Sequence, residues 1–312
     1  MDIFLTIDVE SYTGDYNREV EGGALGLQYV LEQCRRYGIR ATFFMEALGA
    51  TRWGPAPLRD LCRRVAEAGH DLQLHVHPVT ARLDGFQDRF DTMWRQDLAT
   101  QTRLIRVGLE LLHAAGVADV VAFRAGSLAA NADTLAAMTA NGLELGSNRD
   151  LDAKSSIESQ LNAHFPVIND LSRCGAVLDL PVTALRSPLP ALDGPYRHLE
   201  ICAIGALEMR NALRRMARAG YACATILTHP AELFHRVGQD FVPDRLNCGR
   251  LDSLLRLMAD GEAGRPRLVR ECLTEVAVPR QSPPLLLLNP LWAVVRAGAQ
   301  ASKRLRRRRW AR

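Results

Sequence analysis

Short apolar segments rich in β-branched and aromatic residues alternate with segments of helical periodicity along the first half of the chain. In chain order the segments are DIFLTID, LGLQYVLEQCRRYG, RATFFM, PLRDLCRRVAEAG, DLQLHV, a helical pattern over about residues 91–115, VVAFR, ADTLAAMTANG and LELGS. The first and every second one after it have strand character, and the others have helical character. This alternation is typical of parallel strands joined by crossover helices. We therefore expect an α/β fold, either a barrel or a doubly wound sheet.

The second half of the chain continues the pattern less regularly. Strands are expected at AVLDLPV and ACATILTH, and the helical pattern ALEMRNALRRMARAG precedes the second of them. Gly38 and Gly69 stand one or two residues before a strand, where glycine typically ends a helix. Residues 150–174 and 184–204 are richer in Pro, Ser and Asn, so we expect loops or insertions there. One domain over residues 1–280 accounts for all these patterns.

Composition limits the class of protein. The 312 residues are 47% apolar and 24% charged, which allows a large core and argues against a disordered chain. The seven cysteines form no C-x-x-C pair and their number is odd, which argues against a disulfide framework or a cysteine zinc cluster. The start MDIFLTIDVE lacks the basic and long apolar parts of a secretory signal. We expect a cytoplasmic protein with reduced thiols.

Two pairs of potential metal ligands occupy equivalent places. His75 and His77 end the segment DLQLHVHP, and Asp8 and Glu10 lie in LTIDVES. Residues two apart in a strand face the same side, so each pair can project both side chains together. Either pair alone has an ordinary explanation, because His-x-His occurs in half-exposed strands and acids after strands often cap the next helix or loop. Together they favour a hydrolytic site with Glu10, His75 and His77 as metal ligands and Asp8 as general base.

Two further strand ends carry residues that suit this chemistry. Arg124 in FRAGS would need a carboxylate partner if it is buried, and Asp8 could supply it; the alternative is a structural ion pair. Gly126 follows in a tight turn whose N–H groups can face a developing oxyanion. His229 ends TILTHP and can protonate a leaving amine, although a lone histidine there is more often a core or rim residue. Leu227 would lie beside it and wall a small acyl pocket.

These candidates share a position, because each stands at or just after the carboxyl end of an expected strand. In parallel α/β folds ligands bind at that edge, where the loops converge over the sheet or barrel. The set comprises Asp8, Glu10, His75, His77, Arg124, Asp179 and His229. We therefore expect the candidates to form one site.

The sequence resembles the polysaccharide deacetylases of the NodB-homology type, carbohydrate esterase family 4. The resemblance rests on TIDVE, GIRATFF, AGHDLQLHVHP, FRAG, DLPVT and TILTHP, in the family's order over about residues 2–275. It implies a distorted (β/α)7-type barrel, a divalent metal that is most often Zn²⁺, and hydrolysis of an N-acetyl or N-formyl group from an amino sugar. The D-V-E form of the first motif resembles a branch associated with bacterial surface-polysaccharide and lipid-linked sugar clusters, which implies a glycan or a lipid-linked precursor as substrate.

The resemblance also implies roles for single residues. Asp8 matches the catalytic base, Glu10 the metal-binding acid, His75 the first metal-binding histidine, Arg124 the arginine that supports the base, Asp179 the fourth-motif acid and His229 the general acid. The sequence departs from the family's pattern at two points. Val9 separates Asp8 from a glutamate, where the usual motif has two adjacent aspartates. The usual second motif spaces its histidines four apart, which selects Val79, so His77 takes the place of the second histidine.

Two other interpretations stay open. The His-x-His pair is also found in other barrel metallohydrolases, such as amidohydrolases and phosphoesterases, which bind two or three metals. Alternatively, the chain is a degenerate barrel that binds a glycan or a lipid-linked sugar without hydrolysing it. Metal content and acyl release distinguish the three functions.

Residues 281–312 differ from the rest of the chain. They contain eight Arg or Lys and no acid, which leaves 31 basic against 35 acidic residues before them. The stretch PLLLLNPLWAVV is too short to span a bilayer, which takes about 20 apolar residues, but with KRLRRRRWAR after it a peripheral contact with the inner face of the cell membrane is expected. The alternatives are an apolar part packed on the barrel with a disordered end, or nonspecific binding to nucleic acid. Nothing in the main domain predicts specific nucleic-acid recognition.

Overall fold

The computed structural model describes residues 1–86, 91–149, 151, 160–161, 164–165, 168–274 and 283–310; for residues 192–193 and 301–310 it describes the backbone alone. Within this part of the chain one curled sheet of nine strands forms the centre of the molecule. Its strands are β1 (Asp2–Val9), β2 (Thr42–Glu46), β3 (Asp71–Val76), β4 (Ala122–Ala125), β5 (Leu145–Gly146), β6 (Ser172–Cys174), β7 (Val177–Asp179), β10 (Cys223–Thr228) and β13 (Arg265–Arg267). The spatial order is β10-β1-β2-β3-β4-β5-β7-β6, and β13 also pairs with β1.

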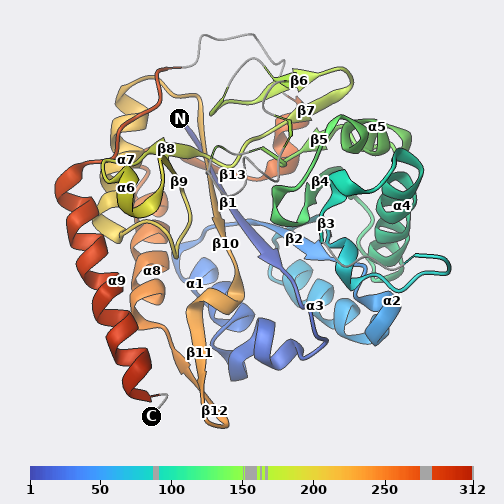
Figure 1. Ribbon diagram of the computed structural model, residues 1–312, viewed down its shortest axis with the longest axis horizontal. Coiled ribbons are helices and arrows are strands. Elements are labelled where there is room, and N and C mark those ends of the chain that lie inside the picture. The colour runs from blue at the N-terminus through green and yellow to red at the C-terminus, as the bar shows by residue number, and fades with distance from the viewer. Residues whose placement is uncertain are drawn as a thin grey trace.

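The sheet is parallel apart from β6, which pairs antiparallel with β7. Beyond β7, a backbone hydrogen bond connects the two ends of the curled sheet. The Thr183 N–H donates to the carbonyl of Thr225 in β10 at 3.1 Å. Every residue of β2, β3 and β10 is buried, as expected for strands covered on both faces. The predicted α/β barrel is confirmed, in the form of a curled half-barrel within one domain (Figure 1).

Helices surround the sheet (Figure 1). They are α1 (Leu27–Tyr37), α2 (Ala50–Trp53), α3 (Pro55–Glu67), α4 (Leu98–Ala114), α5 (Ala132–Ala140), α6 (Pro190–Asp193), α7 (Ala206–Arg218), α8 (Arg245–Ala259) and α9 (Pro290–Trp310). Gly38 ends α1 with a left-handed φ of 65°, as its position predicts. The helix expected over about 91–115 begins only at Leu98, because the side chain of Asp97 accepts the Thr100 N–H and caps the helix there.

The two expected insertions contain some regular structure. The stretch 184–204 holds a short antiparallel pair, β8 (Ala184–Arg186) with β9 (Tyr196–His198), and the helix α6. Much of the other insertion, 150–174, lies outside the described residues, apart from β6 near its end. A second antiparallel pair, β11 (Phe234–Val237) with β12 (Asp240–Pro243), follows β10. β6 belongs to the central sheet, whereas β8 with β9 and β11 with β12 form two separate two-stranded sheets.

The basic C-terminal segment packs against the barrel domain along part of its length. Leu287 forms a bridge with Arg186 of β8, and α9 lies against α7 (Figure 1). Among the described residues, no helix combines the length and the apolar character that crossing a bilayer requires.

Candidate active site

A buried ion pair joins β1 to β4 near their carboxyl ends. Arg124 Nη1 donates to Asp8 Oδ1 at 2.6 Å, which confirms the expected pairing of these residues. Arg124 is fully buried and its guanidinium lies 4.1 Å from the centre of the Phe44 ring. Its Nη2 donates to Thr6 Oγ1 at 3.1 Å and to Ser147 Oγ at 2.8 Å. These bonds satisfy the guanidinium away from water and fix the direction of the Asp8 carboxylate.

Three potential metal ligands converge beside this pair. His75 Nε2 lies 3.2 Å and His77 Nε2 lies 2.7 Å from the same oxygen of Glu10, Oε2. The two Nε2 atoms are 3.0 Å apart. The parallel register of β2 and β3 and the alternation within β3 place both imidazoles on the face that meets the end of β1. The structure therefore brings Glu10, His75 and His77 together, as the spacing of the two histidines predicts.

The other nitrogen of each imidazole has a partner that sets its direction. His75 Nδ1 donates to the backbone carbonyl of Arg124 at 2.8 Å, and His77 Nδ1 donates to Asp91 Oδ2 at 2.6 Å. Because Nδ1 is held as a donor, Nε2 is the nitrogen that faces Glu10, and its lone pair becomes available to a cation when a cation displaces the Nε2 proton. Metal-binding histidines are commonly held in this way, by a carbonyl or a carboxylate on the far nitrogen.

The opposite charges of Glu10 and the histidines stabilise each other's ionised forms. Burial opposes ionisation of Glu10, but the charges of His77 and His229 hold the pKa of Glu10 well below its usual range. Burial also opposes a charge on His77, yet Glu10 and Asp91 raise the pKa of His77 to about 10. The ligand atoms of Glu10, His75 and His77 lie within 4.8 Å of one another. A carboxylate and two inward-facing imidazoles match the chemistry of a hydrolytic divalent-metal site.

A third histidine lies across Glu10 from this pair. His229 follows β10, and its Nε2 is 3.8 Å from Glu10 Oε1. Its Nδ1 lies 2.8 Å from Glu232 Oε1, and Glu232 also accepts the Thr228 hydroxyl at 3.0 Å. Burial opposes a charge on this imidazole, but Glu10 and Glu232 raise the pKa of His229 well above its usual value. His229 is thus suited to carry a proton at neutral pH.

His229 also belongs to a second group of potential ligands, with Glu200 and Glu232. Burial and the charge of Glu232 raise the pKa of Glu200 to about 7. Glu200 Oε1 lies 3.9 Å from His229 Nδ1. The two carboxyl groups therefore stand on one side of His229, opposite Glu10.

Gly126 and Leu227 are the two residues that we expect to contact the substrate. A methyl group added to Gly126 would lie 2.3 Å from His77 Nδ1, so the absence of a side chain lets the turn after β4 approach the imidazole. Leu227 is buried in a small apolar cluster with Leu128 and Val182. Ser127 and Leu128, which follow Gly126, have φ of 53° and 55°, a conformation unusual outside glycine. Contact of Gly126 or Leu227 with substrate stays a prediction.

No family model and no curated protein matches the sequence. Among solved structures, one described as a polysaccharide deacetylase from Mycobacterium smegmatis matches with a TM-score of 0.55 and 15% identity, over 90% of this chain and 94% of that chain. The chain has the polysaccharide deacetylase fold. A 4-α-glucanotransferase from Thermococcus litoralis matches with a TM-score of 0.57 and 13% identity, over 93% of this chain and 42% of that one. Because the two names describe different activities, the polysaccharide deacetylase fold alone does not identify the reaction.

Asp179, the residue that resembles the fourth-motif acid of the deacetylases, lies in a different environment. Its carboxylate accepts Arg149 Nε at 2.8 Å and the Asn148 N–H at 3.0 Å, and it is fully buried. Within the described part of the chain it forms no hydrogen bond or ion pair with Asp8, Glu10 or His229. The register β5 to β7 sets this position, since Asp179 stands beside Gly146. We assign Asp179 to the barrel wall and not to the group around Glu10.

The sequence patterns did not identify several residues that contact the site. Asp91 follows β3 after a long loop, so no periodic pattern connects it with His77. Tyr12 Oη lies 3.1 Å from His77 Nε2, and Tyr12 is 40% exposed. Glu232 is three residues after His229, and that short spacing is the sequence feature that could have indicated their contact. Loop and short-range contacts of this kind depend on tertiary structure.

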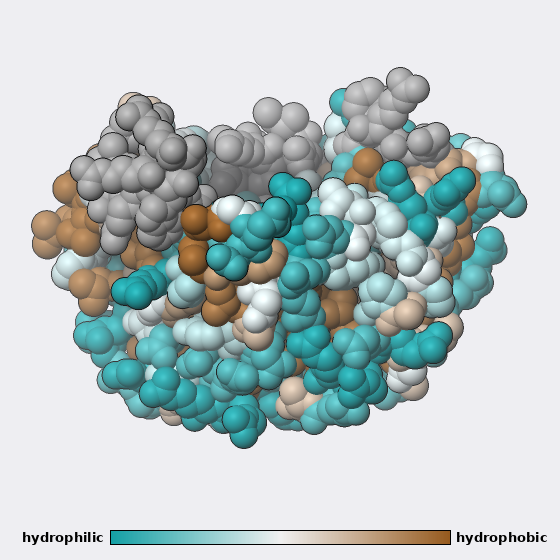
Figure 2. Space-filling model, turned by 90° about the horizontal axis from the view of Figure 1, so that it is seen from below, coloured by the Kyte–Doolittle hydropathy of each residue, from teal (hydrophilic) through white to brown (hydrophobic). Residues whose placement is uncertain are grey.

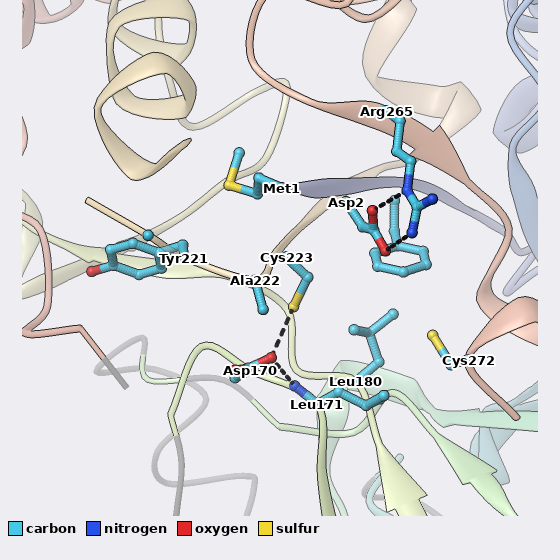
Figure 3. A pocket seen from close by; sticks show the side chains of 12 residues that line it. Met1, Asp2, Asp170, Leu171, Leu180, Tyr221, Ala222, Cys223, Arg265 and Cys272 are labelled. Carbon is cyan, nitrogen blue, oxygen red and sulfur yellow. Dashed lines mark hydrogen bonds and ion pairs between the residues drawn. The ribbon is translucent and has the colours of Figure 1, made fainter. Parts of the chain in front are cut away.

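A cavity of about 530 Å³ lies at the other end of the deacetylase-fold barrel. Met1 and Asp2 from the start of β1 and Ala222 and Cys223 from the start of β10 line it (Figure 3). The bidentate ion pair of Asp2 with Arg265 crosses one side of it (Figure 3). Because these residues lie where β1 and β10 begin, and the two strands end at Glu10 and His229, the cavity is separate from the candidate active site.

Proposed function

We propose that the chain is a metal-dependent hydrolase that removes an N-acetyl or N-formyl group from an amino sugar. The substrate would be a bacterial polysaccharide or a lipid-linked precursor of one, as the resemblance of the D-V-E motif implies. One observation carries the proposal: Glu10, His75 and His77 converge at one point, with the Asp8 carboxylate 3.8 Å from His75 and His229 3.8 Å from Glu10. This arrangement offers a cation site, a base and an acid within one group of side chains.

Glu10, His75 and His77 would hold the divalent cation, and Zn²⁺ suits this donor set best. The cation would polarise the amide carbonyl and lower the pKa of a coordinated water. The protein's own contribution is the direction of the ligands. Asp91 and the Arg124 carbonyl hold the two imidazoles by Nδ1, so both Nε2 atoms face Glu10.

Asp8 is the proposed general base. Arg124 occupies its Oδ1, and Oδ2 lies 3.8 Å from His75 Nε2, on the side of the ligands. Asp8 takes a proton from the attacking water as the water oxygen bonds to the amide carbon. The ion pair with Arg124 keeps the carboxylate in one orientation during this transfer.

His229 is the proposed general acid. Its Nδ1 is held by Glu232, which leaves Nε2 directed toward Glu10 Oε1. As the carbon–nitrogen bond breaks, Nε2 gives its proton to the leaving nitrogen, which departs as the free amine of the sugar. The acid product is acetate or formate. Glu232 acts here as a positioning residue.

Metal content and acyl release together test this proposal. Protein purified without chelators should bind one divalent cation per chain and release acetate or formate from N-acylated amino-sugar substrates. His77→Ala should lower both the metal content and the turnover, while the exposed His113→Ala on α4 should change neither. A wild-type protein that binds the sugar but releases neither acid, with metal present, would favour the non-catalytic sugar-binding barrel instead.

A second candidate function has one observation in its favour. Glu200, His229 and Glu232 form another group of potential ligands next to the first. Two cations per chain, the second lost on Glu200→Gln, would favour a two-metal hydrolase in which His229 is a ligand and not an acid. A stoichiometry of one that Glu200→Gln leaves unchanged would exclude it.

A further inference from the structure

Helix α9 exposes a row of large apolar side chains to solvent. Leu291 is 63%, Val294 is 60% and Val295 is 51% exposed. Their spacing of three and four residues places them on one face of the helix. Figure 2 shows hydrophobic side chains gathered at the left edge of the molecule, the side on which α9 lies in Figure 1. We call these three residues the outer face of α9.

The opposite face of α9 is fixed to the barrel. Arg296 Nε donates to Glu208 Oε2 of α7 at 2.8 Å, and both side chains are almost fully buried. Ala293 is fully buried, and Gln300 Nε2 donates to the Cys202 carbonyl at 3.3 Å. Removing either partner of a buried ion pair is costly, so this contact keeps the helix in one rotation. The exposure of the outer face is therefore built into the fold.

The same helix continues into a strongly basic segment. Its backbone is helical as far as Trp310, and the sequence of residues 303–309 is KRLRRRR, with six cations and no acid. The rest of the chain before residue 281 carries four more acidic than basic residues. Apolar side chains and a concentrated positive charge thus lie on one helix of a protein whose body is slightly negative.

We propose that α9 docks the protein on the surface of an anionic lipid bilayer. The outer face would enter the layer between headgroups and acyl chains, and the cations would bind the negative headgroups. An anionic bilayer would match both the apolar outer face and the basic segment of α9. An acidic protein partner would match the positive charge but not the solvent-facing apolar row. This inference does not depend on the proposed deacetylation.

Vesicle co-sedimentation of the full chain tests the docking. We expect binding to vesicles of phosphatidylcholine with phosphatidylglycerol, and at least tenfold weaker binding to phosphatidylcholine alone. Raising the ionic strength from low to about 0.5 M should weaken binding to the anionic vesicles, because salt screens the headgroup charge. Equal binding to both vesicle types, or no binding to either at low ionic strength, would overturn the proposal.

Two triple variants separate the roles of charge and apolar surface. Arg306→Gln with Arg307→Gln and Arg308→Gln should weaken binding to anionic vesicles about 100-fold, since each cation near such a surface contributes about fivefold. Leu291→Ser with Val294→Ser and Val295→Ser, all exposed, should weaken it about tenfold or more without unfolding the protein. Wild-type binding by the second variant would overturn the role of the outer face.

Matched controls come from exposed residues elsewhere on the molecule. Replacing Arg36, Arg40 and Arg106 with Gln removes the same charge from exposed positions on other elements. Replacing the exposed Leu98 and Ile168 with Ser removes apolar surface away from α9. Both controls should bind vesicles within about threefold of wild type. If the arginine control loses as much binding as the α9 variant, net charge and not α9 is responsible, and the proposal fails.

A duplex of random DNA serves as the competing polyanion. Vesicle binding that depends on the outer face and is not displaced by DNA at an equal phosphate concentration supports the bilayer. Complete displacement, together with DNA binding that the Leu291, Val294 and Val295 substitutions leave unchanged, would assign the basic segment to nucleic acid and overturn the proposal.

Discussion

Two buried aspartate–arginine pairs stand near strand ends of the same barrel, and they differ in the surroundings of their aspartates. Asp8 pairs with Arg124 at 2.6 Å, and Asp179 pairs with Arg149 at 2.8 Å. All four side chains are almost fully buried. From the sequence alone both aspartates were candidates for the same site. The structure gives them different partners.

The immediate surroundings of the two arginines are closely alike. Each guanidinium lies about 4 Å from the centre of a phenylalanine ring, and each donates to a serine hydroxyl. The contacts are Phe44 and Ser147 for Arg124, and Phe165 and Ser172 for Arg149. The environment of the arginine therefore does not distinguish a functional pair from a structural one.

The second carboxylate oxygen of each pair makes the difference. Asp179 Oδ1 accepts the Asn148 N–H at 3.0 Å, so both of its oxygens have donors. Among the described residues, Asp8 Oδ2 receives no hydrogen bond and lies 3.8 Å from His75 Nε2. A buried pair can take part in chemistry only if one oxygen remains for the substrate or for water. Asp8 meets this condition and Asp179 does not.

Substituting Asp8 is the strongest way to break this comparison. Asp8→Asn should lower kcat about a thousandfold or more, because the amide cannot accept the proton of the attacking water. Deacetylation of an N-acylated amino sugar measures the effect, and circular dichroism checks that the variant is folded. A folded variant that keeps a tenth of the activity would refute Asp8 as base.

The same change at the second pair should have a different result. Asp179→Asn should lower the free energy of unfolding by about 3 kcal/mol, because Arg149 is left buried without its counter-charge. The turnover per folded molecule should stay within about threefold of wild type. Urea denaturation and activity at equal folded concentration measure the two effects. A large loss of kcat with unchanged stability would return Asp179 to the catalytic group.

A third aspartate sharpens the comparison, because it acts on a histidine. Asp91→Asn should weaken metal binding 10- to 100-fold, since the carboxylate no longer directs Nδ1 of His77. Competition with a chelating indicator dye measures the affinity. Asp84→Asn, at an exposed position of the preceding loop, is the matched control and should leave the affinity unchanged. If the Asp91 variant binds the metal as tightly as wild type, His77 does not need the Asp91 carboxylate to act as a metal ligand.

A partly exposed pair gives the smallest expected effect. Burial opposes ionisation of Asp2, but hydrogen bonds from Arg265 and Arg267 lower its pKa. A carboxylate with a lowered folded-state pKa stabilises the fold above its unfolded pKa of about 4, and this stabilisation is lost as the pH falls through the folded value. Asp2→Asn should therefore cost about 1 kcal/mol or less at pH 7 and less than that at pH 3.

Denaturation of wild type and the Asp2 variant at both pH values checks this prediction. Arg256→Gln, which removes an exposed cation on α8, should cost less at pH 7. A destabilisation by Asp2→Asn that is equal at the two pH values would show that packing, and not charge, accounts for it.

Much of the candidate site could be predicted from local sequence. Period-two spacing placed His75 beside His77 and Asp8 beside Glu10, and the alternation of strands with helices placed all four at one edge. What the sequence lacked was the identity of neighbours across the sheet. Asp8 and Asp179 both belong to apolar strand patterns, and no periodicity shows which residues each aspartate will contact across the sheet.

The sequence by itself determined the α/β class and the edge at which the site forms, because backbone periodicity and the direction of parallel strands are local properties. Tertiary structure alone decided which aspartate keeps a free oxygen, which loop acid holds His77, and which face of α9 points to solvent. Those outcomes depend on contacts between residues far apart in the chain, such as Arg124 with Asp8 and Arg296 with Glu208. Side-chain burial and pairing at such distances arise only when the strands and helices have packed.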